Sequence, residues 1–184
     1  MESIYVWHQN GGLSTFFEDR TIVPTARENL LSSLRIFTDC NTQEQCRGYA
    51  LGAKAYETWI NGLRDKKWYE THNEEDMARR LNVNQFCMLA LYDARKSAYL
   101  YLKENVKFIQ EVDTENLVQK FERISELAQE IHHALDFGEY VDATHVRKLW
   151  TEELREKQAR YMEEMCELEQ EALKLAETII GTLA

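Results

Sequence analysis

Proline and glycine are scarce in this chain of 184 residues, which contains one proline and seven glycines. The turns of all-β and loop-rich proteins rely heavily on both residues, so their scarcity argues against those folds. The length suits one domain with a sizeable core. A hydrophobic share of 44% with 29% charged residues is typical of a soluble globular chain and not of a disordered one.

Long apolar runs, basic clusters and a secretory leader are also missing. No run approaches the roughly 18 apolar residues that a membrane span needs. Met1 is followed by Glu2 and not by a basic, apolar leader, so no signal peptide is expected. The 22 Lys and Arg against 32 Asp and Glu give a formal charge of −10, which repels nucleic-acid phosphates. We therefore expect an acidic cytoplasmic protein with no membrane or nucleic-acid partner.

Motifs that carry chemistry are absent as well. The four cysteines form no CxxC pair, and the chain has no Gly-rich phosphate loop and no GxSxG elbow. The spacing Glu130-x-x-His133 occurs once, whereas di-iron bundles use it twice with further glutamates. We therefore predict no catalytic residues, no metal and no cofactor.

Turn and capping signals divide the chain into a short β segment and five helices. SIYVWH and LSTFFE flank Asn10-Gly11-Gly12, which predicts a β-hairpin within 1–24. Thr25 and Glu28 have the spacing of a capping box, and Asn73 can cap the third helix. The fold class is therefore mostly α, a bundle or array of about five helices over 25–184 with a small N-terminal hairpin. The predicted helices cover about 25–38, 42–65, 74–105, 114–136 and 142–180.

The last predicted helix would have about 38 residues and a length of roughly 57 Å at 1.5 Å per residue. Its section 151–160 is almost wholly polar. Its apolar seam continues nearly to the C-terminus, which predicts a homodimer through the last helix. The alternative is that this helix folds back along the fourth helix of the same chain. The seam consists of Tyr161, Met165, Leu168, Ala172, Leu175 and Ile179.

The stretch 47–63, RGYALGAKAYETWINGL, combines small residues and aromatic residues on one helical face. Gly52 permits close approach of another backbone, with Tyr56 and Trp59 beside the gap. This pattern favours a small-molecule pocket between the second and third helices, although a simple core helix would show it too. The acidic balance of the chain favours a cationic ligand. The candidate ligand-binding residues are Tyr56, Trp59, Asn84, Tyr92, Asp93 and Arg95.

Residues 48–102 resemble a known family. The segment GAKAYETWINGL (52–63) is followed by Asn84, by the acid-x-Arg sequence Asp93-Ala94-Arg95, and by Ala98 and Leu102. This pattern is similar to the helical C-terminal half of proteins like butirosin biosynthesis protein H. Those proteins pair it with a papain-like N-terminal half that carries a cysteine-dependent activity. The resemblance implies that this chain is the helical module alone, because too few residues precede Thr25 to form the papain-like half.

Three functions follow from these observations. The favoured one is a non-enzymatic helical module that binds a small molecule or a protein partner between the second and third helices. The second is an accessory part of an acyl-transfer or peptidase-like enzyme whose catalytic half lies elsewhere. The third is a structural dimerisation protein.

Overall fold

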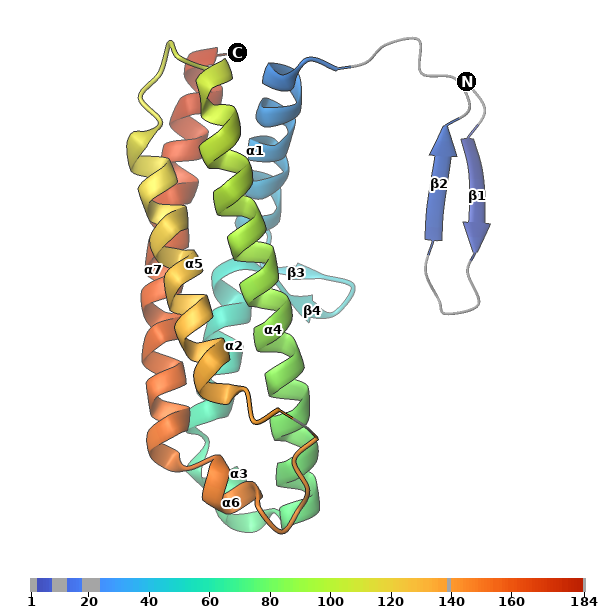
Figure 1. Ribbon diagram of the computed structural model, residues 1–184, viewed down its shortest axis with the longest axis vertical. Helices are drawn as coiled ribbons and strands as arrows, with labels where there is room; N and C mark the ends of the chain where they lie inside the picture. Colours follow the sequence, from blue (N-terminus) through green and yellow to red (C-terminus); the bar gives the residue numbers. More distant parts are fainter. Residues whose placement is uncertain (1–2, 8–12, 18–23, 139, 184) are drawn as a thin grey trace.

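The computed structural model describes residues 3–7, 13–17, 24–138 and 140–183. Over these residues it contains seven α-helices, five of them long, and two small antiparallel hairpins (Figure 1). The predicted mostly α fold is therefore confirmed. In chain order the elements are β1 (Ser3–Trp7), β2 (Leu13–Phe17), α1 (Ala26–Thr42), β3 (Gln45–Cys46), β4 (Tyr49–Ala50), α2 (Gly52–Arg64), α3 (Lys66–Thr71), α4 (Glu74–Asn105), the 3₁₀ turn η1 (Val106–Phe108), α5 (Glu115–Leu135), α6 (Val146–Leu149) and α7 (Glu152–Leu183).

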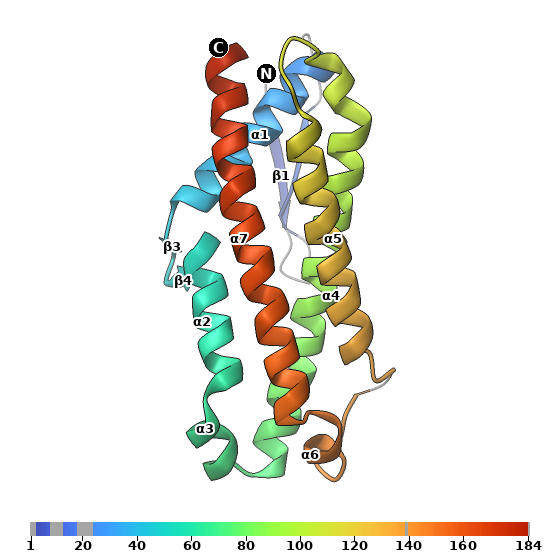
Figure 2. The same cartoon turned by 90° about the vertical axis from the view of Figure 1, so that its left-hand side faces the viewer.

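The long helices form an antiparallel four-helix bundle in which one of the four positions is shared by two helices. Helices α4, α5 and α7 each run along the bundle, and α1 followed by α2 fills the remaining position (Figures 1 and 2). Both α1 and α2 pack against α7, and α5 lies between α4 and α7. The short helices α3 and α6 close the end of the bundle opposite the C-terminus.

The N-terminal hairpin is confirmed as an antiparallel pair in which Ser3 lies opposite Phe17 and Trp7 opposite Leu13. The turn predicted at Asn10-Gly11-Gly12 lies outside the described residues. Thr25 forms the predicted capping box, because its side chain accepts from the Glu28 amide while Glu28 accepts from the Thr25 amide.

The second predicted helix is wrong over its first ten residues. Helix α1 continues to Thr42, and β3 and β4 then form a second hairpin before α2 begins at Gly52. The two central residues of this hairpin, Arg47 and Gly48, have φ of 50° and 85°, the positive values that a two-residue hairpin turn requires. Tyr49 therefore lies outside the helix and is exposed.

The last predicted helix is interrupted. Helix α6 ends at Leu149, and α7 begins only after Trp150 and Thr151. The Thr151 hydroxyl accepts a hydrogen bond from the Leu154 amide, as an N-cap does, and acidic residues fill the first turn. Thr151 followed by two glutamates is thus a helix-start signal within an apolar pattern that otherwise continues through it.

The apolar face of α7 is covered within one chain. Met165, Ala172 and Ile179 of the predicted seam are buried, and so are Arg155 and Gln158 in the section that looked polar. Helix α7 folds back along α5 and also packs on α1 and α2. The prediction that this seam is exposed is therefore wrong, and the homodimer itself stays a prediction.

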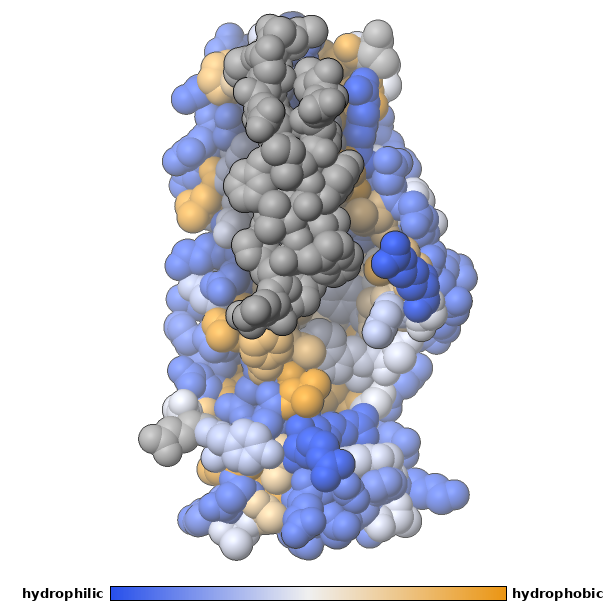
Figure 3. Space-filling view, turned by 90° about the vertical axis from the view of Figure 1, so that its right-hand side faces the viewer, coloured by the Kyte–Doolittle hydropathy of each residue, from blue (hydrophilic) through white to orange (hydrophobic). Residues whose placement is uncertain are grey.

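Apolar side chains are exposed instead on the outer face of α4. Val83 and Phe86 are among the most exposed large hydrophobic residues. Figure 3 shows apolar side chains gathered at mid-height on the face that includes this helix. Within the described ranges, no helix is both long enough and apolar enough to cross a membrane.

Candidate functional site

A cavity of about 360 Å³ opens where α1 gives way to α2. We call it the junction cavity. The end of α1 and the start of α2 contribute most of the lining, α4 contributes two residues and α7 contributes one. Its lining is mostly apolar, with one ion pair. The lining residues are Ile36, Phe37, Cys40, Asn41, Leu51, Gly52, Ala55, Tyr56, Trp59, Leu91, Arg95 and Glu169.

The break between α1 and α2 shapes this cavity. Gly52 begins α2 with φ of 50°, and a Cβ at this position would lie 2.9 Å from the carbonyl oxygen of Asn41. Glycine is therefore required both by the backbone conformation and by the space available. Sequence reasoning expected close backbone approach at Gly52, and the structure shows that the neighbouring backbone is that of α1.

Glu169 on α7 fixes two of the lining side chains. Its Oε1 atom accepts a hydrogen bond from the Tyr56 hydroxyl at 2.7 Å and from Arg95 Nε at 2.5 Å. Burial and then the Glu169 carboxylate raise the pKa of Tyr56, which keeps its hydroxyl protonated. Burial lowers the pKa of Arg95, but the adjacent carboxylate more than offsets this effect and the net direction is upward. The guanidinium therefore stays charged.

The accessible charge of the junction cavity is positive. The Glu169 side chain is only 3% exposed, whereas the Arg95 side chain is 27% exposed. Of the two partners, the arginine is therefore the more accessible. A guanidinium presents N–H donors, which suit a carbonyl or carboxylate oxygen.

Trp59 is held by a separate network of neutral groups. Its indole Nε1 donates to Asn84 Oδ1 at 2.8 Å. Asn84 and Gln158 exchange two amide hydrogen bonds of 3.0 Å, and both side chains are buried. The network ties α2, α4 and α7 together and fixes the position of the indole beside the cavity.

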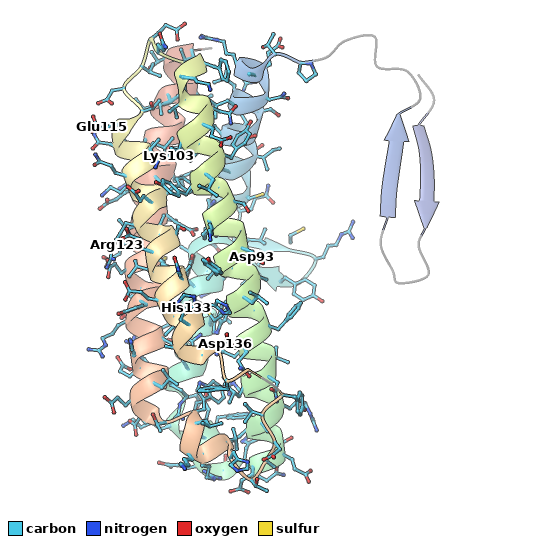
Figure 4. All side chains as sticks on the ribbon, viewed as in Figure 1. Asp93, Lys103, Glu115, Arg123, His133 and Asp136 are labelled. Atoms are coloured by element: carbon cyan, nitrogen blue, oxygen red, sulfur yellow. The ribbon has the colours of Figure 1, made fainter. Side chains whose placement is uncertain are left out.

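The structure brings together only part of the predicted site. Tyr56, Trp59 and Arg95 line the junction cavity. Asn84 lies behind Trp59, where it is buried against Gln158. Tyr92 turns toward α5, where its ring stacks on His132 at a centroid distance of 5.3 Å. Asp93 is exposed on α4 (Figure 4). Asn84, Tyr92 and Asp93 therefore do not line the cavity.

Sequence reasoning missed Glu169, although a signal was present. Glu169 lies midway between Met165 and Leu173 at four-residue spacing, and both of these residues are buried. A charged residue within a buried helical stripe needs a partner, because burial without one is costly. The predicted seam runs through Leu168 and so leaves Glu169 off the buried face.

A larger cavity of about 650 Å³ lies between α2 and α7, but much of its lining is polar or charged. Arg64 on its rim pairs with Glu156 at 2.7 Å and with Glu163 at 2.5 Å. Burial raises the pKa of the Cys166 thiol in its lining, which opposes its use as a nucleophile. This cavity is therefore the weaker candidate for ligand binding.

No group of three or more potential metal ligands occurs within the described part of the chain. Glu130, from the single Glu-x-x-His pair, accepts a hydrogen bond from the Tyr161 hydroxyl at 2.8 Å. His132 and His133 lie beside the Tyr92 ring. The absence of a bound metal stays a prediction from the sequence.

Fold and site together define a four-helix bundle with one interrupted position and a largely apolar cavity at the interruption. Comparisons of the chain with profiles of known protein families, with curated proteins and with solved structures gave no match. The resemblance to the helical half of proteins like butirosin biosynthesis protein H accordingly stays a proposal.

Proposed function

We propose that the protein is a non-enzymatic binding module that holds a small molecule in the junction cavity. The observation that carries this proposal is that Trp59 and Arg95 line one largely apolar cavity and that a hydrogen bond to a buried side chain holds each of them in place. Asn84 holds the indole and Glu169 holds the guanidinium. Binding sites combine apolar walls with a few oriented polar groups in this way.

The lining favours a ligand with an apolar body and one hydrogen-bond acceptor. Ile36, Phe37 and Leu91 supply apolar contact area, and Trp59 supplies an aromatic surface. Arg95 supplies the exposed donor edge. The acidic composition predicts a cationic ligand, but among the described residues the only carboxylate in the lining is that of Glu169, which is 3% exposed. We therefore favour acylated amines and carboxylic acids over simple amines.

A thermal-shift screen tests this function. Amines, their acylated derivatives and the corresponding carboxylic acids are compared on wild type, on Trp59→Ala and on Trp68→Ala. Trp68 lies on α3 outside the junction cavity, stacked on His72, so it controls for the loss of a tryptophan. We expect acylated amines to raise the melting temperature of wild type and Trp68→Ala but not that of Trp59→Ala, and acids to raise that of wild type and Trp68→Ala more than that of Trp59→Ala.

A screen in which every compound shifts wild type and Trp59→Ala equally would reject the junction cavity as the binding site. Stabilisation of wild type by free amines alone would support the junction cavity as the site but show that its ligand is a cation.

A further inference from the structure

A second group of buried polar atoms lies at the end of the bundle that carries α3, α6 and the start of α7. Figure 2 shows these three elements at the same end. Tyr69, Trp150 and Arg155 are 4%, 1% and 8% exposed. The Tyr69 hydroxyl, Trp150 Nε1 and Arg155 Nε are buried without a hydrogen-bond partner in the part of the chain that the structure describes. Buried polar groups are nearly always paired, so three such atoms in one place indicate a missing acceptor.

Arg155 lacks a counter-charge. Its Nη1 donates to the Trp150 carbonyl oxygen at 2.7 Å, and its guanidinium lies 3.7 Å from the centroid of the Tyr69 ring. No carboxylate of the described residues lies within ion-pairing distance of it. Burial lowers the pKa of Arg155, and the nearby Glu152 carboxylate, which forms no ion pair with it, offsets only part of this effect.

The neighbouring cations are already neutralised. Lys66 pairs with Glu152 at 2.7 Å, and Arg147 pairs with Glu74 at 2.6 Å. Among the cations that line the space beside these atoms, Arg155 is therefore the one without an ion pair in the described part of the chain. Arg80 also lacks an ion pair there, but it donates to the Gly62 carbonyl oxygen and lies outside this lining.

Space for a ligand adjoins these atoms. Two cavities of about 220 and 360 Å³ share Lys66, Glu152 and Arg155 in their linings, and the smaller one also includes Tyr69 and Trp150. We call them together the Arg155 cavity. Helix α7, 32 residues long, begins at Glu152 beside this space. The N-terminal end of a helix carries partial positive charge and favours an anion.

We propose that the Arg155 cavity binds the carboxylate group of a small monoanion. Arg155 supplies the charge, and Trp150 Nε1 and the Tyr69 hydroxyl supply donors for the carboxylate oxygens. One unpaired guanidinium balances one negative charge. Glu70 and Glu152 on the rim disfavour a dianion such as phosphate. This site is separate from the junction cavity, so its test is independent of the proposed function.

The Trp150 indole N–H proton gives a direct readout by nuclear magnetic resonance. Sodium acetate is titrated into the full chain at constant ionic strength, with sodium chloride as the replaced salt. The Trp150 signal is assigned by its loss in Trp150→Phe. We expect a saturable shift of this signal with acetate and none with acetamide, while the indole signals of Trp59 and Trp68 stay in place.

Variants separate the role of charge from that of fold. Arg155→Gln is expected to weaken acetate binding by about tenfold or more, because the charge-assisted hydrogen bonds are lost. Arg79→Gln removes an exposed arginine of α4 and is the matched control, with affinity unchanged. Tyr69→Phe keeps the ring and removes one unpartnered hydroxyl. It is expected to fold as wild type does and to bind acetate more weakly, which keeps the test valid if Arg155→Gln unfolds.

The proposal is overturned by an indole signal that does not respond saturably to acetate, or that responds equally to acetamide or chloride. Either result would describe a hydrated polar cavity without anion selectivity. Saturable binding of phosphate in place of acetate would overturn the assignment of the carboxylate class.

Discussion

Gly52 and Asn41 meet so closely that a Cβ on Gly52 would lie 2.9 Å from the Asn41 carbonyl oxygen. We expect Gly52→Ala to destabilise the protein by about 1–3 kcal/mol, because alanine resists the positive φ and contacts the α1 backbone. Urea unfolding measures the change. Gly181→Ala is the control, since Gly181 is helical with open space around it and alanine there should be neutral or stabilising. Equal effects of the two substitutions would contradict the close contact.

The buried amide pair of Asn84 and Gln158 predicts a non-additive double-mutant cycle. Asn84→Leu leaves the Gln158 amide unpaired and should cost about 1–3 kcal/mol. Replacing both residues with leucine also removes the unpaired Gln158 amide, while Trp59 Nε1 lacks its acceptor in both variants, so the double variant should be more stable than Asn84→Leu. Chemical denaturation of the four proteins provides the cycle. Additive losses would show that the two amides do not depend on each other.

The ion pair between Arg95 and Glu169 should be worth more than one at the surface. Glu169→Gln is expected to cost about 2–4 kcal/mol, since it leaves a partly buried guanidinium without its carboxylate. Glu171→Gln, which breaks the exposed pair with Lys120, should cost less than about 1 kcal/mol. Denaturation midpoints of the two variants at equal salt make the comparison. A Glu169→Gln protein as stable as Glu171→Gln would remove Glu169 as the anchor of the junction cavity.

Asp142 predicts a pH dependence at the acid end. Hydrogen bonds from Thr144 and then from His145 lower the pKa of Asp142 to about 2, from 3.8 in the unfolded chain. Its contribution to stability is therefore fully present above about pH 4 and is lost as the pH falls through 2. Asp142→Asn should be less stable than wild type at pH 5, and the difference should shrink toward pH 2. Thr144→Ala should raise the pKa of Asp142, which a titration of its carboxyl resonance can follow.

The burial of the α7 seam predicts how a charge placed in it would act. Met165 is fully buried, so Met165→Glu should unfold the protein, with loss of helical circular dichroism. Lys174→Glu on the exposed side of α7 is the control and should leave the fold intact. Light scattering of wild type at micromolar concentration gives the mass and tests the homodimer. A folded Met165→Glu monomer from a wild-type dimer would show that the seam lies between chains.

The start of a helix was predicted correctly where a single capping residue marks it. Asn73 and Thr25 begin α4 and α1 as expected, because one side chain fixes where the amides are first satisfied. The interruptions at Arg47-Gly48 and at Trp150-Thr151 were missed. In both places the helical period of apolar residues continues on either side, and only the backbone conformation or the Thr151 cap marks the break.

The candidate site was predictable only in part, for a physical reason. Tyr56, Trp59 and Arg95 lie on the apolar faces of their helices, so spacing brought them to one cavity. Glu169 lies over 70 residues from Arg95, and pairing across that distance depends on how α7 packs. Tyr92 was misassigned because its position on α4 also borders α5, and periodicity does not distinguish the two neighbours.

Because α1 and α2 share one bundle position, each helix can rotate about its own axis independently, and this rotation sets which of its side chains face the core. We call it the phase of the helix. A single helix would have to hold one phase of 3.6 residues per turn from Leu30 to Leu63. The exposed β3–β4 hairpin resets that phase, so α2 can turn Tyr56 and Ile60 inward whatever the angle at which α1 presents Leu34. Residues inserted at the tip of this hairpin would change neither phase. The chain can therefore accept length variation at mid-bundle, beside the junction cavity, without moving the buried side chains of α1 or α2.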